Sequence, residues 1–464
     1  MRLAAAFLQQ SLAQHLQAPV PAGLICSGVE TDSRKKCGDA LFVALAGDRF
    51  DGHDFVVDVL SKGAVAAMVH VMRPEYQPYA ERLIVVDDTL KALQQLARSH
   101  LDRLPGKRIG VTGSNGKTTT KELIKGALAG AVGSGYIHAN AGNFNNHIGL
   151  PLSALQAQTH HQFIILEMGM NHFDEITELA GIGQPQIGVI TNIGSAHAGN
   201  LGGVSGVAKA KGELYEYLAQ NNGVLVVNAD DPRCLQQAKR WPEAEVIQFG
   251  RSEMAQVRIT KNEVTAQGLS IGFQYEEESI EVHLPLVGLH NAWNAAAAMA
   301  VAVASGISLT DAAKGLEGVL PSSGRLQQKE LQQGITVLDD TYNANPESME
   351  MGLQTLLAME GQRHIVVLGE MLELGDMAEA SHRSIGAAVA QKEVAALFVC
   401  GALGRFYLEG AEGETSFSPE LVWAENSDAL GLKLKQFVQA GDVLLVKGSR
   451  GSQMEKVFAA LEQE

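Results

Sequence analysis

A glycine-rich segment, residues 110–120 with the sequence GVTGSNGKTTT, contains the side chains best suited to bind phosphate. Its glycines let backbone N–H groups point at phosphate oxygens, and a helix after it adds a positive N-terminal end. In such a loop Lys117 reaches the β- and γ-phosphates, and the hydroxyl of Thr118 binds Mg²⁺. The strict pattern has glycine where this chain has Val111. The segment still predicts a nucleotide-binding loop, because a strand is predicted before it and a helix after it.

A carboxylate, Glu167, ends the next apolar run, residues 163–167. The carboxyl end of a strand in an open α/β sheet is where ligands bind, and a carboxylate there is a usual oxygen ligand of Mg²⁺. The alternative is a solvated carboxylate at a strand end, which is the commoner fate of a single glutamate. We favour the metal role because of the phosphate loop.

The elements that must position these side chains predict an α/β fold. A short strand at 108–112 enters the loop, and a helix leaves it at 117–128. Continuous apolar runs at 163–167, 187–192 and 224–228 suit strands buried on both faces of a parallel sheet. Each run is followed by a polar or glycine-rich turn, which is where such sheets place their ligands.

The length of 464 residues predicts about three domains, at roughly 100–200 residues each. We place them at residues 1–85, 86–318 and 319–464, where the composition and the hydrophobic pattern of the sequence change. Residues 268–285 alternate weakly and predict an antiparallel addition to the central sheet. The third unit again alternates apolar runs with helical stretches, so all three units are predicted to be α/β.

Composition excludes several classes of protein. The formal charge of −16 argues against nucleic acid and anionic membranes as general partners. The four cysteines form no CxxC pair, so neither a zinc site nor a redox pair is predicted, and free thiols fit a reducing cytoplasm. The longest apolar helix, residues 295–304, is about half the roughly 20 residues that a membrane span needs. We expect a monomer, because no coiled coil or apolar interface strip is evident.

Further segments, taken with the phosphate loop, resemble the Mur ligase family, which shares its ATP-binding core with folylpolyglutamate synthetase. The segments are TDSR at 31–34, GDALFVAL at 38–45, GNFNNHIGLP at 142–151, LEMG at 166–169, NIGSAH at 192–197, AKGE at 210–213 and DDTYNANP at 339–346. They occur in order from about residue 27 to 451. The resemblance therefore covers nearly the whole chain.

The resemblance implies a ligase that uses ATP to convert a carboxylate into an acyl phosphate and joins it to an amine, releasing ADP and phosphate. The DDTYNANP segment is similar to the member that adds D-alanyl-D-alanine to UDP-N-acetylmuramoyl-tripeptide in cytoplasmic peptidoglycan precursor synthesis. The implied domains bind the UDP end, bind ATP on a mainly parallel sheet, and close over the nucleotide with a Rossmann-like unit. Alternatives are a sibling that adds a single amino acid and a ligase like folylpolyglutamate synthetase. A kinase or GTPase is disfavoured, because the guanine-reading NKxD motif is absent.

The resemblance also implies roles for individual residues. The implied nucleotide contacts are Gly113, Ser114, Asn115, Gly116, Lys117, Thr118, Thr119, Asn291, Asn294, Arg325, Asp340, Tyr342 and Asn343. The implied contacts to the UDP-linked substrate are Ser33, Arg34, Asp48, Arg49, Phe50, Asn145 and Asn146. The implied metal ligands are Thr118, Glu167, His197 and a carbamylated Lys211, and the implied catalytic residues are Lys117, Glu167, His197 and Lys211.

Several of these residues also have a purely structural or non-functional interpretation. His197, the implied ligand of a second Mg²⁺, could instead cap or pack. Lys211, whose reaction with CO₂ would make it an oxygen ligand, could be an exposed lysine, and its neighbour Lys209 is the obvious misassignment. Asn291 and Asn294 share one helix face, and Asn291 could cap that helix instead.

Three further assignments concern the third unit. Arg325 is expected at the ATP phosphates, with a solvated hinge arginine as the alternative. Asn345 followed by Pro346 predicts a helix start, with Asn345 as the N-cap. The basic segment KGSRG at 447–451 either holds the carboxylate of the dipeptide or forms an ordinary turn, and the sequence favours neither.

Overall fold

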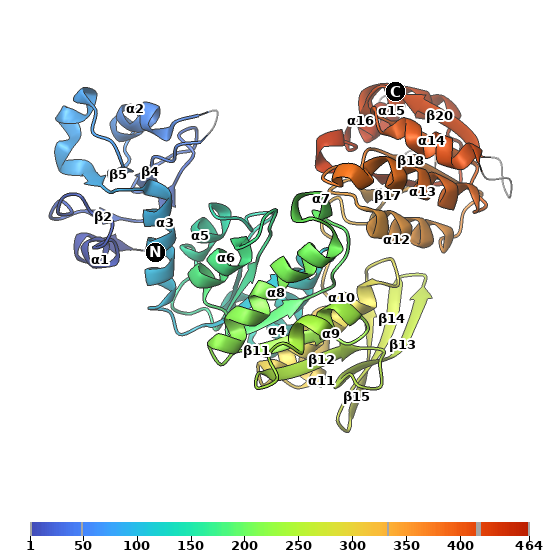
Figure 1. Cartoon of the computed structure of the whole chain (residues 1–464), viewed down its shortest axis with the longest axis horizontal. Helices are drawn as coiled ribbons and strands as arrows, with labels where there is room; N and C mark the ends of the chain where they lie inside the picture. Colours follow the sequence, from blue (N-terminus) through green and yellow to red (C-terminus); the bar gives the residue numbers. More distant parts are fainter. Residues whose placement is uncertain (1, 48–49, 332–333, 414–418, 463–464) are drawn as a thin grey trace.

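The computed structural model describes residues 2–47, 50–331, 334–413 and 419–462, and these form three lobes, each built on its own sheet (Figure 1). The central lobe joins the other two, with the N-terminal lobe at one end and the C-terminal lobe at the other. The fold is α/β, as the alternation of apolar runs and helical stretches predicts.

The N-terminal lobe has a parallel sheet with the strand order β3-β4-β5-β6. Its strands are β3 (Val29–Glu30), β4 (Leu41–Val43), β5 (Ala66–Val69) and β6 (Leu83–Val85). A small antiparallel pair, β1 (Leu3–Ala4) and β2 (Ile25–Cys26), lies beside helix α1 (Ala5–Ser11). Helix α2 (Val56–Ser61) follows the short turn η1 (Gly52–Phe55), and η2 (Pro74–Arg82) precedes β6.

The central sheet has the order β15-β14-β13-β12-β11-β10-β7-β9-β8. Its strands are β7 (Lys107–Thr112), β8 (Ile137–Ala139), β9 (Phe163–Glu167), β10 (Ile187–Ile190), β11 (Val224–Asn228), β12 (Glu245–Gly250), β13 (Val257–Thr265), β14 (Gly268–Tyr275) and β15 (Glu278–Leu284). Pairing is parallel from β8 to β13 and antiparallel from β13 to β15. The phosphate loop follows β7, whose neighbours β9 and β10 both come later in the chain. This reversal of strand order is where open α/β sheets bind ligands.

Helices cover both faces of the central sheet. The helices of this lobe are α3 (Thr89–Leu101), α4 (Lys117–Val132), α5 (Gly149–Ala154), α6 (Glu175–Gly183), α7 (Ala198–Leu201), α8 (Val204–Gln220), α9 (Pro232–Ala238), α10 (Asn291–Ala304) and α11 (Leu309–Leu316), with the turn η3 (Ser134–Tyr136). Helix α4 ends at Gly133, whose φ of 89° lies in the left-handed region that favours glycine. It therefore runs one turn beyond the predicted residue 128.

The C-terminal lobe has the strand order β16-β17-β21-β18-β19-β20, parallel except for the β16–β17 pair. Its strands are β16 (Gln327–Leu331), β17 (Ile335–Asp340), β18 (Arg363–Leu368), β19 (Ala396–Cys400), β20 (Glu420–Ala424) and β21 (Asp442–Lys447). Its helices are α12 (Pro346–Leu357), α13 (Ala378–Ala390), α14 (Gly404–Glu412), α15 (Ser427–Phe437) and α16 (Lys456–Glu462), with the turns η5 (Gly375–Met377) and η6 (Arg450–Ser452). The lobe is thus Rossmann-like.

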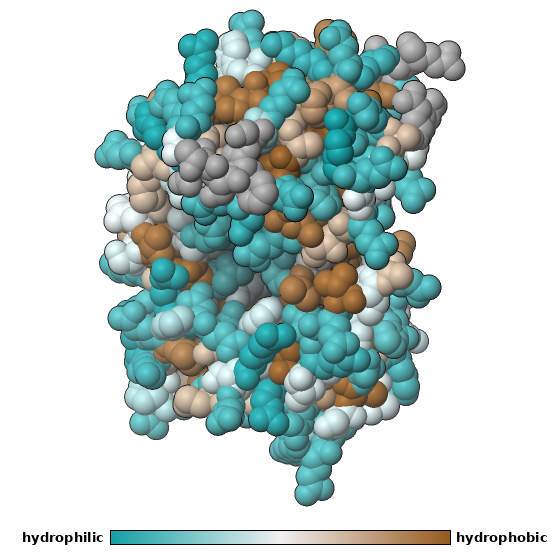
Figure 2. Space-filling model, turned by 90° about the vertical axis from the view of Figure 1, so that its right-hand side faces the viewer, coloured by the Kyte–Doolittle hydropathy of each residue, from teal (hydrophilic) through white to brown (hydrophobic). Residues whose placement is uncertain are grey.

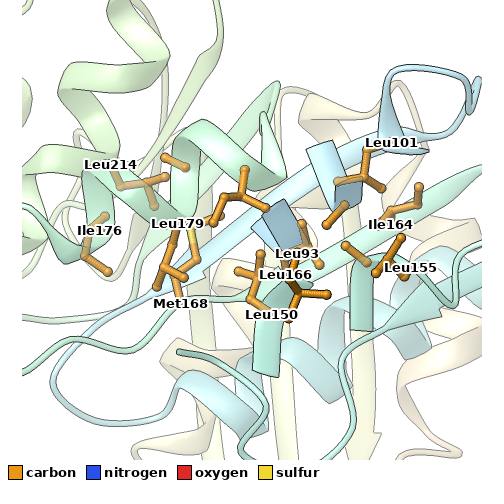
Figure 3. Packing of buried hydrophobic residues seen from close by; sticks show 14 of the residues in the cluster. Leu93, Leu101, Leu150, Leu155, Ile164, Leu166, Met168, Ile176, Leu179 and Leu214 are labelled. Atoms are coloured by element: carbon orange, nitrogen blue, oxygen red, sulfur yellow. The ribbon is translucent and has the colours of Figure 1, made fainter. Parts of the chain in front are cut away.

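Helix α3 connects the N-terminal lobe to the central one through a shared core. Its Leu93 lies near Leu166 of β9 and its Leu101 near Ile164 of the same strand (Figure 3), and the same cluster includes Leu179 of α6 and Leu8 of α1. The helix begins at Asp88, whose carboxylate accepts hydrogen bonds from the N–H groups of Leu90 and Lys91. Burial of the apolar side chains in this shared cluster stabilises the association of the two lobes.

Candidate active site

A cavity of about 360 Å³ lies between the central and C-terminal lobes. Figure 2, which views the molecule from the side of the C-terminal lobe, shows a hollow with mainly hydrophilic surface between its upper and lower halves. The predicted site residues that line the cavity are Ser114, Asn115, Gly116, Lys117, Thr119, Asn145, Asn146, Glu167, His197, Asn291, Asn294, Arg325, Asp340, Tyr342 and Asn343. Residues far apart in the sequence therefore meet here, among them Asn115 and Asn345, which are 230 positions apart.

The remaining predicted residues lie elsewhere. Gly113, Thr118 and Lys211 are buried but do not line the cavity. In the N-terminal lobe, Phe50 is 78% exposed, and the exposed Arg34 donates hydrogen bonds to Asp32 at 2.8 Å. Ser33 is half-buried in the same lobe, and Asp48 and Arg49 lie outside the described residues.

The phosphate loop is held by the two residues that follow β10. The N–H of Asn115 donates to Oδ1 of Asn192 at 2.9 Å, and the hydroxyl of Thr191 donates to the carbonyl oxygen of Asn115 at 2.6 Å. Gly116 precedes α4 with a φ of 80°, which L-residues with side chains rarely adopt. The loop thus presents the N-terminus of α4 to the cavity, as an anion site requires.

Of two lysines near the loop, Lys117 is half-buried at the cavity and Lys211 is fully buried. The ammonium group of Lys117 donates to the carbonyl oxygen of Gly113 at 2.7 Å, and burial lowers its pKa to about 8. Burial, with the charge of Lys117 as a second cause, lowers the pKa of Lys211 well below its ordinary value. Lys209 instead is exposed, with its ammonium group 5.2 Å from the centre of the Phe173 ring. Burial therefore distinguishes the two candidates, and it disfavours the charged form of Lys211.

Glu167 ends β9 beneath the cavity with only 1% of its surface exposed. Its Oε1 accepts a hydrogen bond from Asn145 at 2.8 Å, and its N–H donates to Oδ1 of Asn140 at 2.8 Å. Oε2 is buried without a hydrogen-bond partner among the described residues, and the nearest cation, Nζ of Lys121, lies 3.9 Å away. A buried carboxylate oxygen with a free lone pair suits a cation ligand.

His197 is in contact with the C-terminal lobe. Its Nδ1 lies 2.7 Å from Oε2 of Glu373, and this contact lowers the pKa of the Glu373 carboxyl. The histidine has a φ of 65°, so its backbone is in a sparsely populated conformation. Such strain persists only when the surrounding structure holds it, and it is common at functional sites.

The two asparagines of α10 form a chain of hydrogen bonds to the phosphate-loop helix. Nδ2 of Asn294 donates to Oδ1 of Asn291 at 2.8 Å, and Nδ2 of Asn291 donates to the carbonyl oxygen of Val287 at 2.7 Å. Oδ1 of Asn294 accepts from the hydroxyl of Thr120 at 3.2 Å. Each amide nitrogen keeps a second N–H, so both side chains can also contact a ligand.

On the side of the C-terminal lobe, Asp340 is held by two donors. Its Oδ2 accepts from Nζ of Lys447 at 2.5 Å, and its Oδ1 accepts from the N–H of Leu326 at 3.2 Å. The guanidinium of Arg325 lies 4.0 Å from the centre of the Tyr342 ring, a cation–π contact. The basic segment at 447–451 is therefore not simply a free anion site, because its lysine pairs with the predicted ribose ligand.

Asn345 has two roles in the structure. It is the N-cap of α12, with a reciprocal capping box to Ser348, as its sequence context predicts. Its Nδ2 also donates to Oδ1 of Asn115 in the phosphate loop at 2.8 Å.

Sequence reasoning missed three side chains at this site. Lys121 is fully buried beside Glu167, and its position four residues after Lys117 was the available signal. Glu347 and Glu373 reach the central lobe from the C-terminal one. Local sequence gives no indication of such long-range contacts.

The strand–loop–helix at the reversal point of a mainly parallel sheet, facing a second α/β lobe, defines a phosphate-loop nucleotide-binding protein. Within the described residues, no group of three or more His, Cys, Asp and Glu is arranged to hold a metal ion. That is usual for Mg²⁺, which binds through one or two carboxylates together with substrate phosphates.

Comparison with known proteins gives the family. The chain matches the profiles of the Mur ligase family catalytic domain (residues 26–101), the Mur ligase middle domain (111–302) and the Mur ligase glutamate ligase domain (324–450). This chain belongs to the Mur ligase family. The sequence-based prediction of the family is confirmed.

Individual relatives match over nearly their whole length. The UDP-N-acetylmuramoyl-tripeptide–D-alanyl-D-alanine ligase of Bacillus subtilis is 38% identical over 439 residues, covering 94% of this chain and 93% of the relative. The protein of the same name from Escherichia coli is 33% identical, covering 95% of each. Among solved structures, MurF from Acinetobacter baumannii has a TM-score of 0.88 at 33% identity and covers 100% of this chain and 99% of its own. MurF ligase from Thermotoga maritima, solved with ADP, has a TM-score of 0.81 at 27% identity, and the match covers 94% of this chain and 97% of that chain.

Proposed function

We propose that the chain is an ATP-dependent ligase that joins D-alanyl-D-alanine to UDP-N-acetylmuramoyl-tripeptide. The observation that carries this proposal is the cavity between the lobes, where the phosphate loop and the Glu167 carboxylate face the C-terminal residues Arg325 and Asp340. The relatives named for this activity match more than nine-tenths of the chain. The product belongs to peptidoglycan precursor synthesis.

The nucleotide is ATP, with its phosphates at the loop and its base toward α10. Lys117 and the α4 N-terminus bind the phosphates, while Asn291 and Asn294 border the adenine. From the other lobe, Asp340 accepts from the ribose hydroxyls, and Arg325 faces the phosphates. The proposed nucleotide contacts also include Gly113, Ser114, Asn115, Gly116, Thr118, Thr119, Tyr342 and Asn343.

Mg²⁺ is the proposed metal. The free Oε2 of Glu167 fits a hard cation, with Thr118 as a phosphate-side ligand and His197 as the ligand of a second ion. We also propose that Lys211 is carbamylated. Burial favours the neutral form of its amine, which is the form that attacks CO₂, and the resulting carbamate would supply oxygen ligands where an ammonium group would repel a metal. Bound metal would neutralise the negative charge that develops between the two anions.

The UDP-linked substrate would span the N-terminal and central lobes. Ser33, Arg34 and the loop of Phe50 are the proposed contacts of the UDP end, and Asn145 and Asn146 those nearer the ATP site. This assigns residues 1–85 to the UDP end, 86–318 to ATP, and 319–464 to closure over the nucleotide. The proposed compartment is the cytoplasm, which the four buried, unpaired cysteines fit. No helix in the described ranges is long and apolar enough to cross a membrane.

The reaction proceeds in two displacements. A carboxylate oxygen of the tripeptide attacks the γ-phosphorus of ATP, and ADP leaves. The amino nitrogen of the dipeptide then attacks the acyl carbon, the C–O bond to phosphate breaks, and the amine loses its proton to give the amide. Lys117 and Arg325 offset the charge of the approaching anions.

Trapping of the intermediate tests this proposal. With ATP and UDP-N-acetylmuramoyl-tripeptide but no dipeptide, hydroxylamine should intercept the acyl phosphate as a hydroxamate. The Lys117→Ala variant should give none. Hydroxamate formation without the tripeptide, or ADP release without any hydroxamate, would argue against acyl-phosphate chemistry at this site.

A further inference from the structure

The first turn of α12, in the C-terminal lobe, contacts both loops that border the phosphate end of the cavity. Its N-cap Asn345 bonds to Asn115 of the phosphate loop. Two residues later, Oε1 of Glu347 accepts from the N–H of Ser195 at 2.8 Å, and Oε2 accepts from the Ser195 hydroxyl at 2.7 Å. Ser195 lies in the turn that follows β10 and carries His197.

Both oxygens of Glu347 are engaged by one residue of the other lobe, so this side chain is committed to a protein contact. The approach is close, because a Cβ added at Gly194 would lie 3.1 Å from the carboxylate carbon of Glu347. The negative charge in the first turn of α12 also suits the positive end of the helix. The contact is thus well defined on both sides.

The turn is anchored a second time beyond His197. That residue meets Glu373, and the backbone at Gly199 lies so close to the C-terminal lobe that an added Cβ would be 2.7 Å from the nitrogen of Gly375. Figure 1 shows α7, which starts directly after His197, beside this lobe. The segment from Ser195 to Gly199 therefore takes its shape from contacts supplied by the C-terminal lobe.

We propose that Glu347 is a positioning residue, which sets the turn from Ser195 to His197 so that His197 faces the phosphate end of the cavity. The inference rests on the proposed function, in which His197 acts at that end. It assigns Glu347 no contact with substrate. Docking of the C-terminal lobe thereby positions a turn of the central lobe at the phosphate end of the cavity.

Two substitutions separate position from charge. Glu347→Ala removes both contacts. Glu347→Gln can keep both, because its amide oxygen accepts from the Ser195 N–H and its NH₂ group donates to the Ser195 oxygen. Glu350→Ala, on the exposed face of the same helix, is the matched control.

The test combines steady-state kinetics of phosphate release with hydrogen–deuterium exchange of the peptide that contains Ser195. Glu347→Ala should lower kcat by about 10- to 100-fold, as expected for a displaced catalytic group, with the KM for the UDP-linked substrate nearly unchanged. Exchange at the Ser195 amide should rise by about tenfold or more. Glu347→Gln and Glu350→Ala should resemble the wild type in both measurements.

Equal losses in the Gln and Ala variants would overturn the proposal, because charge rather than position would then matter. Faster exchange in Glu347→Ala with unchanged kcat would also overturn it, since the contact would exist without a role in turnover. Unchanged exchange in Glu347→Ala would show that the contact does not hold the turn. A wild-type protein inactive on these substrates would refute the proposed function instead, while exchange would still report on the contact.

Discussion

Replacing Lys447 by methionine should weaken ATP binding more than dipeptide binding. The Lys447 side chain is 2% exposed and its partner Asp340 14%, and Nζ also donates to the carbonyl oxygen of Asn343 at 2.9 Å. Methionine keeps most of the volume but leaves a largely buried carboxylate without its cation. Breaking such a pair costs about 3 kcal/mol.

The loss should appear in two measurements. The unfolding temperature of the C-terminal lobe should fall by roughly 6–12 °C, because each kcal/mol of lost stability lowers it by about 2–4 °C. Because Asp340 would no longer be held toward the ribose, the KM for ATP should rise by about 10- to 100-fold, equivalent to one charged hydrogen bond of about 1.5–3 kcal/mol. The KM for D-alanyl-D-alanine should change by about twofold or less, well below the tenfold that 1.4 kcal/mol would produce.

Controls sharpen this prediction. Arg450→Met alters an exposed cation of the same segment, which pairs with Glu455 at 2.8 Å, and should leave both KM values unchanged. Asp340→Asn combined with Lys447→Met should cost much less than the sum of the single changes, because the two residues act together. A large rise in the dipeptide KM with an unchanged ATP KM would refute this reasoning and assign the lysine to the dipeptide carboxylate.

Three further predictions address other parts of the chain. Lys211→Ala should abolish most phosphate release while Lys209→Ala retains it, and equal activity of the two variants would refute the role of the buried lysine. Gly116→Ala places a Cβ 2.4 Å from Oδ1 of Asn294 at a φ of 80°, so ADP affinity measured by calorimetry should fall by about tenfold or more for a strain of about 1–2 kcal/mol; an unchanged affinity would show that the loop tolerates the clash. Burial lowers the pKa of His138 to about 4, so its contribution to stability is present above its unfolded pKa of about 6.5 and is lost as pH falls toward 4. The free energy of unfolding, measured with urea, should therefore fall by up to about 3 kcal/mol over this pH range. The His138→Gln variant should lose most of this pH dependence. An identical pH profile in the variant would contradict the role of His138.

The sequence predicted the phosphate-binding half of the site because that half is local. The phosphate loop follows its strand directly, and Glu167 ends the next apolar run, so periodicity and the position of polar residues were sufficient. Strands β9 and β11 have the predicted bounds. The predicted strand 187–192 is shorter in the structure, as β10 (Ile187–Ile190), because Thr191 and Asn192 hydrogen-bond to the phosphate loop instead.

The two edge strands of the C-terminal sheet escaped prediction. The sequence QQKEL of β16 has little apolar character, since this strand forms an antiparallel edge, with half-buried side chains alternating with exposed ones. Strand β20 lies at the other edge of the same sheet. Edge strands bury less surface than central ones, so their hydrophobic pattern is weak.

Contacts between the lobes could not be predicted from the sequence either. Ser195 and Glu347 are 152 residues apart, and neither stands in a motif that indicates a partner. Burial likewise resolved what local pattern left open, by separating Lys211 from Lys209. Such pairings depend on how the lobes are docked, which neither propensity nor periodicity encodes.

Phosphate release from ATP, measured with UDP-N-acetylmuramoyl-tripeptide and a panel of amine acceptors, tests both the ligase activity and the identity of the acceptor. A ligase specific for the dipeptide should show strong turnover with D-alanyl-D-alanine and little with single amino acids. Turnover with a single amino acid in place of the dipeptide, or no turnover with any acceptor, would contradict it.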